Sequence, residues 1–136
     1  MKKSERSLTE TEDIQINWQK LETVCKGVIP CVVQDAKTKK VLLLAYVNQE
    51  ALEATLRTGL ATFWSTSRNC LWVKGKESGN FLYVLEIRVN CEQNSLLYLV
   101  SLTKGGACHT KNSKGEYRQS CFCRKIEEGE LVSEEE

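Results

Sequence analysis

Much of the apolar content of this chain lies in short runs with the composition of β-strands. The runs 28–34 and 41–47 are rich in apolar or β-branched residues, and the polar segment 35–39 between them is typical of a turn. The longest run, 81–89, alternates side chains with a period of two, which predicts a strand with one face turned inward. These patterns constrain the chain to a fold built largely from hairpins.

Further strand-type segments occur at 61–65, 71–74, 96–102 and 121–126. Asn48 is a good N-cap, and Gly59 is placed where a helix would stop, so we expect a helix over 49–57. A second, short helix is expected over 16–21. The predicted fold class is therefore α+β, with a mostly antiparallel β-sheet and one or two helices against it.

The length of 136 residues and a hydrophobic content of 41% suit a single folded domain. We expect a polar N-terminal segment at 1–16, the domain itself at 17–126 and an acidic C-terminal tail at 127–136. Like-charge blocks repel and stay extended, so we expect both ends to be loosely ordered.

The charges nearly cancel, with Lys+Arg 19 against Asp+Glu 18, which argues against nucleic acid or a membrane surface as a partner. The polar start has no apolar core of a signal peptide, and 41–47 is far shorter than the roughly 20 residues of a membrane span. We therefore expect a cytoplasmic protein. Disulfides are disfavoured there, so the seven cysteines are interpreted as metal ligands, nucleophiles or buried small residues.

Three cysteines and the single histidine lie in the segments 105–110 and 120–124. Thiolates and imidazole are preferred zinc ligands, and a metal site and buried cysteines are about equally consistent with this pattern. In a strand, Cys121 and Cys123 would point to opposite faces, so one of them is expected in a site. His109 is interpreted as an ordinary hydrogen-bonded residue, as a proton-transfer group beside Cys108, or as half of a Cys–His nucleophilic pair.

Two polar loops, 65–69 and 74–80, supply cations, hydroxyls and glycine-freed amides. Such loops suit a phosphate-bearing ligand, although ordinary hairpin turns have the same composition. The turn 90–94 has one carboxylate and two amides, which is a weak donor set for a hard divalent cation.

The order of these pieces resembles the phosphoribosyl-AMP cyclohydrolase family of histidine biosynthesis. The resemblance covers roughly 27–125 and is carried by seven segments: Val33-Gln34-Asp35, 41–52, Phe63-Trp64-Ser65-Thr66-Ser67-Arg68, 71–75, Ser78-Gly79-Asn80, Ala107-Cys108-His109-Thr110 and Ser120-Cys121-Phe122.

The resemblance implies an intertwined homodimer in which each zinc is held by cysteines from both subunits. The matching positions are Cys91, Cys108 and Cys121. It also implies a nucleotide substrate, 1-(5-phosphoribosyl)-AMP, whose adenine ring is attacked at C6 by a zinc-activated water so that the N1–C6 bond opens; zinc deaminases attack adenine C6 by comparable chemistry. In that assignment His109 moves protons, and the substrate is bound by Arg68, Lys74 and Ser78.

The chain also departs from the family pattern. The family has an Asp-Cys-Asp-x-Asp magnesium motif, where this chain has Asn90, Glu92 and Asn94, so magnesium affinity should fall unless substrate phosphates compensate. Glu77, Leu82 and Lys111 are further replacements, and an insertion at 112–118 separates Thr110 from Ser120. Two alternatives follow: a paralogue that hydrolyses another purine-like nucleotide, and a non-catalytic dimeric zinc-binding protein on the same scaffold.

Overall fold

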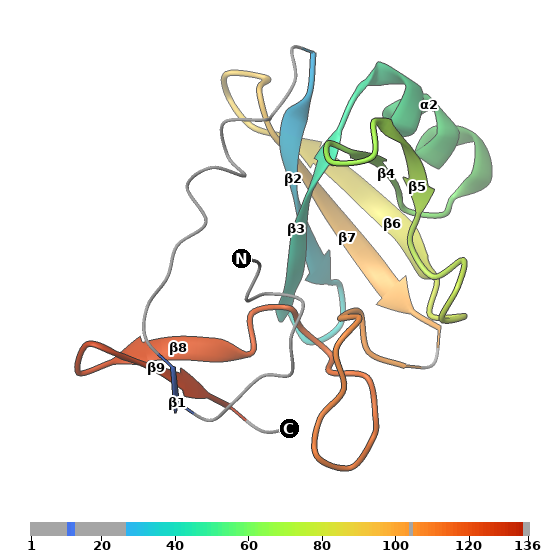
Figure 1. Cartoon of the computed structure of the whole chain (residues 1–136). Helices are drawn as coiled ribbons and strands as arrows, with labels where there is room; N and C mark the ends of the chain where they lie inside the picture. Colours follow the sequence, from blue (N-terminus) through green and yellow to red (C-terminus); the bar gives the residue numbers. More distant parts are fainter. Residues whose placement is uncertain (1–10, 13–26, 104, 135–136) are drawn as a thin grey trace.

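The computed structural model describes residues 11–12, 27–103 and 105–134 (Figure 1). The helix expected over 16–21 and most of the segment 1–16 lie outside the described residues. The one described helix is α2 (Gln49–Thr58). The strands are β1 (Thr11–Glu12), β2 (Ile29–Asp35), β3 (Val41–Val47), β4 (Thr62–Ser65), β5 (Cys70–Val73), β6 (Leu82–Val89), β7 (Leu96–Leu102), β8 (Arg124–Glu127) and β9 (Glu130–Ser133).

The central sheet has four strands in the order β3-β2-β7-β6. Strands β2 and β7 pair in parallel, and the other neighbours are antiparallel. The predicted hairpin of β2 and β3 is closed at its turn by Asp35, whose carboxylate accepts hydrogen bonds from the Lys37 N–H and the Thr38 hydroxyl, both at 3.0 Å. The α+β class with a mostly antiparallel sheet is therefore confirmed.

Helix α2 begins and ends where its caps predict. The Asn48 side chain accepts from the Ala51 N–H at 2.8 Å, and Gly59 ends the helix with a φ of 78°, in the left-handed conformation that favours glycine. The helix and the β4–β5 hairpin lie on the same side of the central sheet (Figure 1). No helix among the described ranges is long and apolar enough to cross a bilayer.

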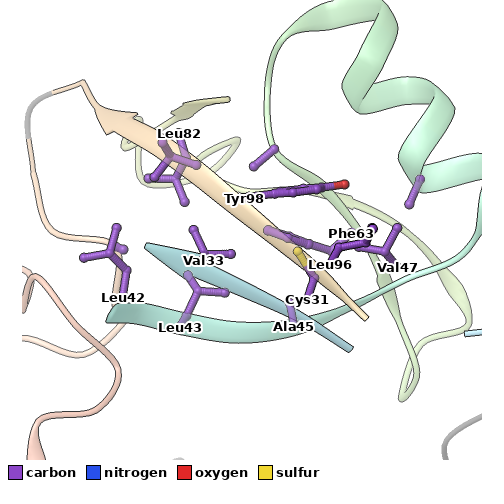
Figure 2. Packing of buried hydrophobic residues seen from close by; sticks show 14 residues of the cluster. Cys31, Val33, Leu42, Leu43, Ala45, Val47, Phe63, Leu82, Leu96 and Tyr98 are labelled. Carbon is purple, nitrogen blue, oxygen red and sulfur yellow. The ribbon is translucent and has the colours of Figure 1, made fainter. Parts of the chain in front are cut away.

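The core lies between the central sheet and the layer of α2 and β4–β5 (Figure 2). Phe63 of β4 stacks on Tyr98 of β7 with ring centroids 6.0 Å apart, and Trp72 packs against Phe63 at 5.4 Å. Cys31 is fully buried among them, so this cysteine has a packing role, as one of the sequence interpretations allowed. Burial of these apolar side chains fixes the sheet against the helix.

Strand β6 differs from the sequence prediction of one inward face. The pairing register with β7 shifts between Val84 and Glu86, so the period of two is interrupted by a bulge. Val84 and Ile87 pack partly against the core, while Leu85 is 64% exposed. The prediction of regular alternation is wrong here because the bulge turns an apolar side chain away from the core.

The C-terminal residues also differ from expectation. The acidic tail was expected to be loosely ordered, but β9 pairs with β8 in an antiparallel hairpin and with β1 on its other edge. Lys125 makes ion pairs with Glu127 and Glu134 that offset part of the acidic charge. The strand predicted over 121–126 is β8 and starts at Arg124, so the two cysteines before it do not follow strand alternation.

Candidate metal and catalytic site

The loop that follows β7 brings Cys108 and Cys121 together. The Ala107 N–H donates to the Gln119 carbonyl and the Cys108 N–H to the Arg118 carbonyl, both at 3.0 Å. The chain thus doubles back on itself. The Cys121 N–H then donates to the Leu42 carbonyl at 2.7 Å, which anchors the returning segment on β3.

The insertion at 112–118 lies within this return of the chain. The Asn112 side-chain oxygen accepts from the N–H groups of Lys114 and Glu116 at 2.9 and 3.1 Å, and the Lys111 ammonium lies 4.9 Å from the ring centroid of Tyr117. The insertion is a compact turn that closes on itself. The added residues therefore do not separate the two cysteines in space.

The two thiols are electrostatically coupled. The hydrogen bond with Cys121 lowers the pKa of Cys108, and further hydrogen bonds with Thr110 act in the same direction. The Cys108 sulfur lies 2.9 Å from the Thr110 hydroxyl. The pKa of Cys121 is raised, first by the same bond and then by desolvation, although Cys121 as a residue is exposed. A lowered pKa favours the thiolate form of Cys108, which is the form that binds a soft metal.

Lys74 follows β5 and is buried, with 7% of its surface exposed. Burial lowers the pKa of its ammonium, and the nearby Cys121 and Cys108 act in the opposite direction. Its Nζ is 5.9 Å from the ring centroid of Trp72. The sequence suggested a cation on a polar loop, whereas the structure places it inside, facing the thiol pair.

His109 is exposed while its neighbour Cys108 is 4% exposed, so the two side chains face different surroundings, as adjacency predicted. Its charge nevertheless contributes to the lowered pKa of Cys108. Cys123 is buried, and burial raises its pKa. All described cysteines are free thiols, which agrees with the expectation that they do not form a bridge framework.

The loop containing Ser78 lies against the segment that leads to the cysteines. Thr103 donates to the Gly79 carbonyl at 3.5 Å, and the Ser78 hydroxyl accepts from the Asn80 N–H at 3.1 Å. Sequence reasoning did not assign a role to Asn80, which is 3% exposed and whose Nδ2 has no hydrogen-bond partner among the described residues. The one signal in the sequence was its place in the Ser78-Gly79-Asn80 segment that carries the resemblance. Its packing is visible only in the structure, where a Cβ at Gly105 would approach Asn80 Oδ1 to 2.5 Å.

The remaining candidates are not brought to this pair within one chain. Cys91, Asn90, Glu92 and Asn94 lie in the turn that precedes β7, whereas the Cys108 segment follows it. Seven strand residues separate the two ends by about 20 Å. Arg68 lies at the closed end of the β4–β5 hairpin, and Lys74 at its open end. No three His, Cys, Asp or Glu side chains gather closely enough to hold a metal in the described part of the chain.

Comparison with known proteins identifies one family. A family model described as phosphoribosyl-AMP cyclohydrolase matches residues 43–123, which span β3 to the second cysteine segment. A phosphoribosyl-AMP cyclohydrolase of Archaeoglobus fulgidus is 53% identical over 106 residues, which are 78% of this chain and 92% of that protein. Those of Hyphomonas neptunium and Methanosarcina acetivorans are each 51% identical, over 77% and 79% of this chain and 75% and 83% of their own lengths. The chain belongs to the phosphoribosyl-AMP cyclohydrolase family.

Proposed function

We propose that this protein is a zinc-dependent phosphoribosyl-AMP cyclohydrolase that acts in the cytoplasm in histidine biosynthesis. Its reaction is a hydrolysis of the adenine ring of 1-(5-phosphoribosyl)-AMP in its imino form. The oxygen of water joins C6, the N1–C6 bond breaks, one proton goes to N1 and the other to the exocyclic nitrogen, which leaves a carboxamide. The observation that carries the proposal is the coupled thiol pair of Cys108 and Cys121 beside a buried Lys74.

The thiol pair fits zinc by its donor chemistry. Zinc prefers thiolate ligands, and the lowered pKa of Cys108 favours the deprotonated form that a metal needs. A catalytic zinc keeps a coordination position open and, when bound, activates a water molecule. Cys108 and Cys121 would hold it from one subunit, and Cys91 of the partner subunit would complete the set.

An exposed apolar surface supports the homodimer. Strand β6 is an edge of the central sheet, and Tyr83, Leu85 and Val89 on it are 50%, 64% and 55% exposed. Leu56 of α2 is 67% exposed and lines a hollow together with Leu85. The segment 59–61 pairs with the first half of β6, through the hydrogen bond from the Ala61 N–H to the Leu82 carbonyl and the one from the Val84 N–H to the Gly59 carbonyl. Exposed apolar side chains gathered along such an edge are typical of a surface that another chain covers. The turn with Cys91 continues from this strand, so a second copy docked on β6 would lie close to it.

The other side chains have roles that follow from where they lie. His109, exposed next to Cys108, would move protons between water and the ring nitrogen. Lys74 and Ser78 would bind the substrate beside the thiol pair. Arg68 lies in the turn that joins β4 to β5, away from Lys74, so it would bind phosphate at the site to which Cys91 contributes.

Zinc content tests the metal site. Purified protein should hold zinc, and Cys108→Ala or Cys121→Ala should abolish its retention. Cys70→Ala is the matched control, because Cys70 is also exposed but lies on β5. Full zinc retention by the Cys108→Ala variant would contradict the proposal.

Turnover of 1-(5-phosphoribosyl)-AMP tests the activity. Ring opening at a normal rate excludes the paralogue with another substrate, and its loss in His109→Ala excludes a purely structural protein. A zinc-loaded protein that leaves this nucleotide intact would contradict the proposed function.

A further inference from the structure

The turn between β6 and β7 is closed by two asparagine side chains. Asn90 Oδ1 accepts from the N–H groups of Asn94 and Ser95 at 2.9 and 3.0 Å, and Asn90 Nδ2 donates to Asn94 Oδ1 at 2.6 Å. In the backbone, the Asn90 N–H donates to the Ser95 carbonyl at 3.2 Å. We call the paired side chains of Asn90 and Asn94 the amide clasp.

The amide clasp leaves few donors for a magnesium ion. A side-chain amide oxygen has two lone pairs, and both of those on Asn90 are engaged. One of the two lone pairs on Asn94 Oδ1 is also engaged, by the Asn90 amide. Glu92 is the only carboxylate at positions 90, 92 and 94. Magnesium binds through carboxylates and substrate phosphates in octahedral geometry. These residues do not fit the magnesium site that the family motif implies.

Aspartates at positions 90 and 94 would behave differently. A carboxylate can accept the two backbone hydrogen bonds but cannot donate one, so the 2.6 Å contact would become a pair of facing negative oxygens. Such a pair repels unless a cation lies between its members. In this chain the Asn90 side-chain amide donates an N–H to Asn94 Oδ1, so the contact is attractive without a cation.

We propose that the amide clasp replaces a bound magnesium ion at this turn and holds Cys91 in position without a cation. Asn90 and Asn94 are thus positioning residues. Only the role of Cys91 as a zinc ligand rests on the proposed function. The replacement itself concerns the turn and is testable without catalysis.

Manganese(II), a spectroscopic substitute for magnesium, tests the replacement. Free Mn²⁺ is measured by electron paramagnetic resonance while it is titrated into the zinc-loaded protein without substrate. The wild type should show no saturable binding. Asn90→Asp combined with Asn94→Asp should bind at least about thirtyfold more tightly, from the attraction between one added charge and a divalent ion about 4 Å away in water.

Thermal melting gives a second readout on the same variants. Magnesium should raise the melting temperature of the double aspartate variant and leave that of the wild type unchanged. The proposal is overturned if the wild type binds one Mn²⁺ per chain and Glu92→Gln, the matched control, abolishes that binding. Neither measurement needs turnover. A protein that lacks hydrolase activity can therefore still support or contradict the replacement of magnesium, and the two failures are distinguishable.

Discussion

Two variants that each lack a zinc ligand should restore one site when they are combined. The perturbation is Cys91→Ala in one copy and Cys108→Ala in the other, co-expressed with different affinity tags. Because Cys91 lies before β7 and Cys108 after it, and the strand itself is about 20 Å long, we expect that one chain cannot supply both ligands to one metal. In an isologous dimer each site would combine Cys108 and Cys121 of one copy with Cys91 of the other.

The magnitude follows from counting the intact sites. The mixed dimer contains one complete site and one site with both defects, so after purification on both tags it should hold about half of the wild-type zinc and turnover. Each homodimeric variant should hold close to none. Zinc is measured by atomic absorption and turnover by the ring-opening assay. If the mixed dimer shows no recovery while both single variants lose zinc, the ligands come from one chain and the reasoning is refuted.

Three further outcomes follow from the packing. Ser120→Ala should lower the free energy of unfolding in urea by about 1–3 kcal/mol, because its buried hydroxyl donates to the Val41 carbonyl at 2.7 Å, whereas Ser101→Ala at an exposed position should not. Burial raises the pKa of Cys31 from 9.0 to about 12. The contribution of this thiol to the free energy of unfolding is therefore fully present below pH 9 and is lost as pH rises toward 12, and Cys31→Ala should reduce that alkaline loss. Leu85→Glu should give a monomer in sedimentation analysis, and the equally exposed control Ile126→Glu should not; an unchanged mass for Leu85→Glu would contradict the β6 interface.

Local patterns were enough to predict most of the elements. The helix after Asn48 and the strand at 41–47 are found where propensity and capping place them, because both depend on neighbours in sequence. The exposed face of β6 and the hairpin at the C-terminus were not predictable in this way. A bulge and a strand pairing depend on the partner strand, and no residue of the strand itself specifies them.

For the candidate site, the sequence likewise indicated some of the residues, and the structure alone showed their contacts. The resemblance supplied Cys108 and Cys121 as members of one site, and the structure brings them together through the return of the chain at 118–119. The burial of Lys74 could not be inferred from its loop, since a lysine in a polar segment is ordinarily solvated. The hydrogen bonds of Asn90 and Asn94 likewise depend on the shape of the turn.

The sequence by itself therefore determined the family and the strand-rich α+β class, because these depend on residue types in order along the chain. Only the tertiary structure decided which side chains meet. Cys108, Cys121 and Lys74 converge because the loop after β7 returns onto β3 and Lys74, at the end of β5, is buried next to it. Cys91 lies beyond the opposite end of β7. The physical reason is that contacts between distant residues form only when the whole core packs, and no local preference encodes them.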